Sequence, residues 1–138
     1  MSTKTIARKL LIKPGLRLWL SPETEPGLLE PLPDNVDQVA DLADADVAIV
    51  SVSTAAEATS ILAALAPDLG KPQVLWVFYP KGNVTDINRD SLWSLLAGYG
   101  LRPITQVAVD DIWSALRFRP LRADEKPFVP DTGASAAT

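Results

Sequence analysis

The side chains that could do chemistry in this chain follow predicted strands. Tyr79-Pro80-Lys81-Gly82 comes directly after the most apolar run of the sequence, and Asp110-Asp111 follows a later predicted strand. Parallel strands bring their carboxyl ends to one rim of a sheet, and ligands of open α/β sheets bind outside that rim. We therefore expect polar residues at the strand ends to converge there. The candidate ligand-binding residues are Ser21, Ser53, Thr54, Tyr79, Lys81, Gly82, Asp110 and Asp111.

This combination of side chains favours a small polar or anionic ligand. Lys81 is the only basic residue in the set, so it is the residue expected to bind an anion. Asp110 and Asp111 would then bind the polar end of the ligand, or hold Lys81 when the site is empty. A simpler structural interpretation stands beside this one, because a lysine between Pro80 and Gly82 fits a solvated turn and acidic pairs often form turns.

Several classes of chemistry are excluded by composition and spacing. The chain has no histidine and no cysteine, which rules out Ser–His–Asp and Cys–His mechanisms, thiol redox chemistry and Cys/His zinc sites. Gly70-Lys71 is followed by Pro72 and lacks the spacing of a phosphate-binding loop. Gly98 and Gly100 fit a helix end better than a dinucleotide fingerprint. We predict no metal site and no cofactor.

Charge is unevenly distributed along the 138 residues. Residues 1–17 carry five basic residues and no acid, residues 18–70 carry ten acids and no base, and the net charge is −4. Nucleic-acid-binding proteins usually present a broad basic face, so we expect no nucleic-acid partner and a solvated basic segment that pairs with the acidic block. Apolar runs such as Val74 to Tyr79 are far too short to span a membrane. We expect no membrane contact and a cytoplasmic location.

Three helices and five strands are predicted to position the candidate residues. Alternation predicts a strand over 16–20 and a loop over 21–27. Thr54 and Glu57 form a capping box for a helix over 54–66, and a later helix begins at Asp86 or Asn88. A further helix is predicted after Pro33 from apolar residues at helical spacing, namely Val36, Val39, Ala40 and Ala43.

The remaining strands determine the fold class. The near-continuous apolar runs 47–52 and 74–79 are typical of central strands buried on both faces of a parallel sheet. Residues 110–113 are too short for a parallel crossover, so 115–119 should return antiparallel to 103–109 as a hairpin. Its alternation of Leu116 and Phe118 with Arg117 and Arg119 favours an edge strand with one wet face.

Together these elements predict an α/β fold with a three-layer, Rossmann-like, mostly parallel sheet and a C-terminal antiparallel hairpin strand. Residues 1–120 should form a single domain, and 121–138 a poorly ordered tail.

Residues 45–119 resemble the closing half of a class I S-adenosylmethionine-dependent methyltransferase. The resemblance is carried by the strand ending Ile49-Val50-Ser51-Val52, helix 54–66, Gly70-Lys71-Pro72-Gln73, the strand at 75–77 and the hairpin at 103–119. That family closes its sheet with such an antiparallel strand. Tyr79-Pro80-Lys81-Gly82, residues 86–90 and residues 110–117 also resemble small uncharacterised bacterial α/β proteins of this truncated type, which implies no activity.

The chain departs from the methyltransferase pattern where the cofactor would bind. The family has a glycine-rich turn after its first strand and an acidic residue ending its second strand. Here the strand over 16–20 runs into Ser21-Pro22-Glu23-Thr24-Glu25-Pro26, and proline offers no amide hydrogen. At least one strand–helix unit is missing before Val47, so no functional residue of the family carries over and S-adenosylmethionine is not expected to bind.

The sequence therefore favours a non-catalytic, Rossmann-like binding or interaction protein. The alternative is a small transferase, methyltransferase-like, or another cofactor-binding enzyme that uses the rim of the sheet. Trimmed sheets often expose apolar surface that a partner covers. A homodimer is accordingly expected through the segment that contains Leu28, Leu29 and Leu32, with Trp19 before it.

Overall fold

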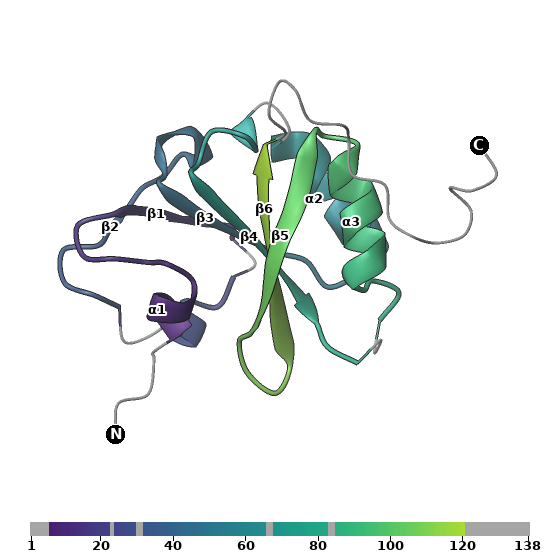
Figure 1. The fold of residues 1–138 in the computed structure, drawn as a ribbon, viewed down its shortest axis with the longest axis horizontal. Helices are drawn as coiled ribbons and strands as arrows, with labels where there is room; N and C mark the ends of the chain where they lie inside the picture. The colour runs from purple at the N-terminus through teal and green to yellow at the C-terminus, as the bar shows by residue number, and fades with distance from the viewer. Residues whose placement is uncertain (1–5, 23, 30–31, 66–67, 83–84, 121–138) are drawn as a thin grey trace.

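Six strands form one mixed sheet in the order β2-β1-β3-β4-β6-β5 (Figure 1). The computed structural model describes residues 6–22, 24–29, 32–65, 68–82 and 85–120. The neighbours β2 (Asp37–Gln38), β1 (Arg17–Leu20), β3 (Val47–Ser51) and β4 (Val74–Pro80) run parallel. β6 (Trp113–Pro120) is antiparallel to both β4 and β5 (Leu101–Ala108). The predicted fold class, mostly parallel with an antiparallel C-terminal hairpin strand, is confirmed.

Helices cover both faces of this sheet, which makes three layers (Figure 1). α2 (Ala55–Leu65) and α3 (Arg89–Ala97) pack on one face, where Ala58, Leu62, Leu92 and Leu96 meet the side chains of β3, β4 and β6. α1 (Ile6–Lys9) and the 3-10 helix η1 (Pro26–Leu29) lie on the other face. A second 3-10 helix, η2 (Leu42–Asp44), precedes β3.

The two central strands are β3 and β4, as predicted. Every residue of both strands is buried. Their side chains alternate between the two cores, because Ala48 and Val50 contact the helical face whereas Val47 and Ile49 contact the α1 face. Strands covered on both faces need no polar alternation, which explains the continuous apolar runs.

The expected position of the last strand was wrong. β6 is an interior strand that pairs with β4 on one side and β5 on the other, and β5 forms the edge. Leu116 and Phe118 point to the helical core, whereas Arg117 and Arg119 lie on the opposite face. The alternation of apolar and charged side chains indicates that one face of a strand is exposed to solvent. Whether the strand lies at the edge of the sheet depends instead on which of its backbone groups have hydrogen-bond partners, and the side-chain pattern does not show those partners.

The helix predicted after Pro33 is absent, and part of that segment forms β2 instead. Asn35 has a φ of +62°, a left-handed conformation that interrupts a helix. The chain then runs along β1, where Asp37 N donates to Leu16 O at 2.9 Å and Val39 N to Leu18 O at 2.9 Å. Val36 and Val39 pack into different cores, on opposite faces of the sheet. Their spacing suits an extended chain as well as a helix.

The N-terminal segment is part of the core rather than a solvated arm. Ala7, Leu10 and Ile12 are fully buried against the sheet, and the Trp76 indole N–H donates to Leu10 O at 2.8 Å. The expected pairing with the acidic block occurs at Arg17, whose side chain lies 3.4 Å from Asp46.

The apolar segment expected to form a homodimer serves the chain's own cores. Leu29 is fully buried on the α1 face, with Leu28 and Leu32 packed beside it. Trp19 lies in the opposite core and donates its indole N–H to Ala40 O at 3.1 Å. These side chains do not form one exposed patch, so the structure gives no support to a dimer through them. Among the described residues, no helix is long and apolar enough to cross a membrane.

Candidate functional site

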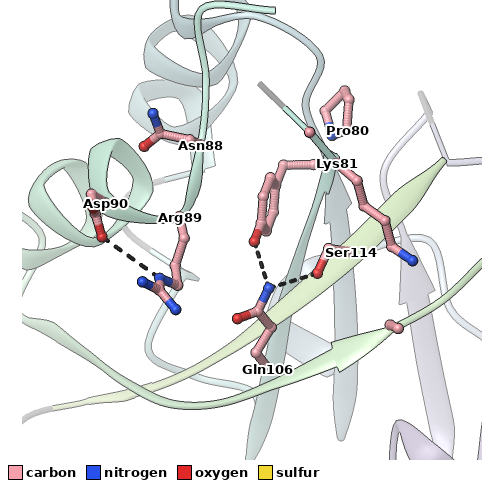
Figure 2. Close-up of a pocket in the computed structure, with 10 residues that line it drawn as sticks. Pro80, Lys81, Asn88, Arg89, Asp90, Gln106 and Ser114 are labelled. Carbon is pink, nitrogen blue, oxygen red and sulfur yellow. Dashed lines mark hydrogen bonds and ion pairs between the residues drawn. The ribbon is translucent and has the colours of Figure 1, made fainter. Parts of the chain in front are cut away.

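An open pocket of about 600 Å³ lies at the end of β4, where the strands β5 and β6 face the start of α3 (Figure 2). Gly82 allows the chain to leave β4 sharply, because its φ of +76° is a conformation that glycine adopts without strain. The lining residues are Tyr79, Pro80, Lys81, Gly82, Asn88, Arg89, Asp90, Gln106, Ala108 and Ser114.

Three polar side chains form the floor of the pocket. Gln106 Nε2 donates to Tyr79 Oη at 2.8 Å and to Ser114 Oγ at 2.9 Å. The sheet register brings these residues together, because Tyr79 and Ser114 are directly paired between β4 and β6. Tyr79 is only 5% exposed and Ser114 only 3% exposed. The two hydroxyls are therefore held in fixed positions by one carboxamide.

The start of α3 forms the opposite wall. Asn88 is the N-cap, since its side chain accepts from Ser91 N at 2.9 Å while Ser91 Oγ accepts from Asn88 N at 2.9 Å. The cap fixes the first turn of the helix and thereby the Cα position of Arg89. The Arg89 guanidinium lies 4.9 Å from the centre of the Trp93 ring, and its Nε is 3.6 Å from Asp90 Oδ1.

The electrostatics of the pocket favour negative charge. Lys81 and Arg89 are its two cations and Asp90 its one carboxylate among the lining residues. In Figure 2 Asp90 lies on the far side of Arg89 from Gln106, whereas Arg89 and Gln106 border the same space. The pocket also lies at the start of a helix, where the dipole adds positive potential.

Of the eight candidate residues from the sequence, Tyr79, Lys81 and Gly82 line this pocket. Lys81 has a different orientation from the one expected, because its side chain extends away from Arg89 and Gln106 (Figure 2). Its backbone N–H donates to Ile112 O at 2.7 Å, which joins the end of β4 to the β5–β6 turn.

Ser21 belongs to a separate, buried hydroxyl cluster with Thr24 and Ser51. Thr24 Oγ1 is 3.0 Å from Ser21 Oγ and 2.7 Å from Ser51 Oγ, and Ser21 Oγ accepts from Ser51 N at 3.0 Å. The exposed fractions are 2% for Ser21, 6% for Thr24 and 2% for Ser51. The cluster closes the carboxyl ends of β1 and β3.

Ser53 and Thr54 lie directly before α2 and take part in the cap at its N-terminus. Thr54 Oγ1 accepts from Glu57 N at 3.1 Å, as the predicted capping box requires. The Glu57 carboxylate accepts from Ser53 N at 2.6 Å, one residue before the cap amide. Asp86, one of the two candidates for the cap of α3, instead accepts from Ala55 N at 2.8 Å. The amides of Ala55 and Glu57 at the start of α2 are therefore bonded to side chains of the chain itself.

Asp110 and Asp111 do not line the pocket. Asp110 Oδ1 accepts from Ile112 N at 2.8 Å and from Trp113 N at 2.7 Å. Asp110 therefore stabilises the hairpin turn between β5 and β6. Asp111 is exposed in the same turn. The simpler structural interpretation of the acidic pair matches these contacts.

Residues that sequence reasoning missed supply most of the polar wall, namely Asn88, Arg89, Asp90, Gln106 and Ser114. For Asn88 the sequence predicts only a helix cap. The sequence does contain one signal for part of this wall. A hairpin turn at 110–111 brings residues at similar distances on either side of it close together, and Gln106 and Ser114 are diagonal neighbours in that hairpin. Nothing in the sequence brought that pair to Tyr79, because this contact depends on β6 lying between β4 and β5.

The fold places the chain in a recognised structural class, the Rossmann-like α/β proteins with a methyltransferase-like sheet. No protein-family model and no curated protein matches the chain. An uncharacterised protein of Listeria monocytogenes aligns with a TM-score of 0.57 and 10% identity, over 96% of this chain and 72% of that one. A protein of the NADB-Rossmann superfamily from Streptococcus agalactiae gives 0.54 and 11%, over 92% and 72% of the two chains.

A third solved structure is a putative tRNA (m1A22) methyltransferase of Streptococcus pneumoniae, with a TM-score of 0.52 and 10% identity over 88% of this chain and 70% of that one. At these identities the likeness concerns the fold alone. It confirms the methyltransferase-like architecture that the sequence suggested.

Proposed function

We propose that this chain is a non-catalytic binding protein whose pocket takes a small polar molecule. The observation that carries this proposal is the pair of buried hydroxyls, Tyr79 and Ser114, held by Gln106 at the floor of an open pocket. Polar groups at such a position cost free energy to bury unless they are well bonded. Few apolar side chains accompany them, so the polar end of a ligand is the part that the pocket fits best.

Support for a non-catalytic role comes from the carboxyl ends of β1 and β3. In the methyltransferases that the fold resembles, the backbone approaches the cofactor after the first strand. Here the buried hydroxyl cluster of Ser21, Thr24 and Ser51 occupies that position, with its groups bonded to one another. The start of α2 is likewise bonded to Glu57 and Asp86. We therefore propose that S-adenosylmethionine does not bind at this end of the sheet.

A small transferase is the second candidate function, and the fold similarity to the Streptococcus pneumoniae protein favours it. Calorimetric titration with S-adenosylmethionine separates the two candidates. We expect no heat of binding. A dissociation constant in the micromolar range would overturn the non-catalytic proposal.

The pocket itself is tested by a thermal-shift screen with nucleotides, nucleosides and small organic acids. A ligand present at about 100 times its dissociation constant should stabilise the fold by about 2.7 kcal/mol. Gln106→Leu should abolish the shift, because it releases both hydroxyls. Gln38→Leu, on the exposed strand at the other end of the sheet, is the matched control. If no compound raises the melting temperature, or if both variants respond as the parent does, the pocket proposal fails.

A further inference from the structure

The floor of the pocket has hydrogen-bond donors to spare. Gln106 Nε2 supplies a hydrogen to each of two hydroxyl oxygens, Tyr79 Oη and Ser114 Oγ. A hydroxyl that accepts a hydrogen bond still has its own hydrogen to donate. Within the described part of the chain, neither of these two hydroxyl hydrogens has an acceptor. At the floor of the pocket, two fixed O–H donors therefore have no acceptor among the residues that the structure describes.

The wall of the pocket adds a positioned cation. The Trp93 ring lies under the Arg89 guanidinium at 4.9 Å and holds it without consuming its N–H groups. Asp90 approaches only Nε, at 3.6 Å, and in the described residues the terminal amino groups of Arg89 have no partner. A guanidinium stacked in this way loses less rotational freedom when it binds an oxyanion than a flexible lysine would.

From these donors we infer that the ligand binds through an oxyanion, a carboxylate or a phosphate, bonded to Tyr79, Ser114 and Arg89. This inference rests on the proposed function and adds the chemical class of the ligand. Oxyanions offer several acceptor lone pairs to hydroxyl and guanidinium donors at once. The Asp90 carboxylate does not oppose this arrangement directly, because Arg89 lies between it and Gln106 (Figure 2).

The same donors also predict which ligands the site should prefer. A neutral ligand that offers one carbonyl could satisfy one hydroxyl but would leave the second hydroxyl and Arg89 without partners. A buried hydroxyl left without an acceptor disfavours binding, and the Arg89 charge would gain nothing from a neutral ligand. Oxyanions should therefore bind more tightly than neutral compounds of the same size.

The test is a titration of the full chain by 15N NMR with four probes: inorganic phosphate and succinate as oxyanions, adenosine and ribose as neutral compounds. We expect phosphate and succinate to move the amide signals of residues 79, 81, 82, 88–90 and 114, with an affinity that falls as salt is added. Arg89→Gln should weaken phosphate binding about 10-fold or more. The double variant Tyr79→Phe with Ser114→Ala should weaken it about 10-fold while Arg89 remains.

Lys13→Gln is the matched control, because it removes one exposed positive charge from the N-terminal segment. It should leave phosphate affinity within about 2-fold of the parent, since it lies outside the pocket. Melting temperatures of all variants show whether a loss of binding is a loss of folding. An equal loss in Lys13→Gln and Arg89→Gln would mean that phosphate binds only through overall charge, and the inference would be wrong.

The four probes also separate this inference from the proposed function. If adenosine or ribose moves the pocket signals and neither oxyanion does, the oxyanion inference is wrong and the binding pocket stands. If none of the four probes moves a pocket signal and the wider screen is negative, both fail.

Discussion

At the scale of single residues, the two cations of the pocket differ in how they are held. Arg89 is stacked on Trp93, whereas Lys81 has no such support and extends away from the polar floor. Sequence reasoning selected Lys81 because it follows the most apolar strand. The position along the chain was informative, but the direction of a side chain after a turn depends on the turn's backbone and on the neighbouring strand.

Lys81→Ala is expected to change the free energy of unfolding by no more than about 0.5 kcal/mol, because a half-exposed side chain is lost and the backbone bond to Ile112 remains. Phosphate affinity should fall less than in Arg89→Gln. Urea unfolding and phosphate titration measure the two effects. A loss of phosphate affinity as large as that of Arg89→Gln would mean that Lys81 binds the anion directly.

The candidate site could be predicted only where it coincides with the end of a strand. Tyr79, Lys81 and Gly82 could be predicted from the pattern because they lie at the end of β4 or directly after it. Gln106 lies on β5 and Ser114 on β6, and their contact with Tyr79 depends on the position of β6 between β4 and β5. The sequence does not show which two strands β6 lies between. Ser21, Asp110 and Thr54 also lie at ends of elements, but their polar atoms are used in a hydroxyl cluster, a turn and a cap.

At the scale of elements, Asp46 joins β1 to β3. Its carboxylate accepts from Arg17 N at 3.0 Å and from the Arg17 guanidinium at 3.4 Å. The backbone hydrogen bond, followed by the side-chain hydrogen bond, holds the pKa of the Asp46 carboxyl below its ordinary value. A carboxyl whose pKa is lowered by folding stabilises the fold above its ordinary pKa. That contribution is lost as the pH falls through the lowered value.

Asp46→Asn tests this effect, because asparagine keeps an acceptor and removes only the charge. Near neutral pH the variant should be less stable by about 1 kcal/mol, the difference between a hydrogen bond to a charged and to a neutral acceptor. The difference should shrink to zero in acid below the lowered pKa. Urea unfolding at several pH values measures it, with Asp37→Asn on the exposed β2 as control. A difference that persists unchanged in acid would contradict the assignment.

The elements that the sequence predicted well are those whose burial is complete. β3 and β4 are covered on both faces, so their composition alone distinguishes them from other segments. β2 could not be predicted, because two valines three residues apart fit both a helix and a chain that sends them to opposite cores. The extended conformation is favoured over the helix by the positive φ of Asn35 and by the edge of β1, with which β2 pairs. The pairing with β1 is a tertiary contact, so the local sequence does not show it.

At the scale of the whole molecule, the N-terminal segment is the third layer of the fold. Leu10 is fully buried against the sheet and its carbonyl accepts the Trp76 indole hydrogen. Leu10→Ala should lower the free energy of unfolding by about 2–5 kcal/mol, the usual range for a large-to-small change in a core. Trp fluorescence during urea unfolding measures the loss.

Lys9→Ala is the control one residue earlier, where the side chain is exposed. It should change stability by no more than about 0.5 kcal/mol. If Leu10→Ala were equally mild, the N-terminal segment would be a surface attachment rather than a layer of the core.

The insertion of β6 between β4 and β5 has a consequence for how the chain is made. β5 leaves the ribosome before β6, but among the described strands it bonds only to β6. A nascent chain that stops before Trp113 therefore has β4 with an unpaired edge and β5 with no strand to pair with. The sheet can close only when residues 113–120 have been synthesised and have left the exit tunnel. Until that moment β4, the longest fully buried strand among the described residues, exposes unpaired backbone groups along one edge. A chaperone at the tunnel mouth would recognise such an edge.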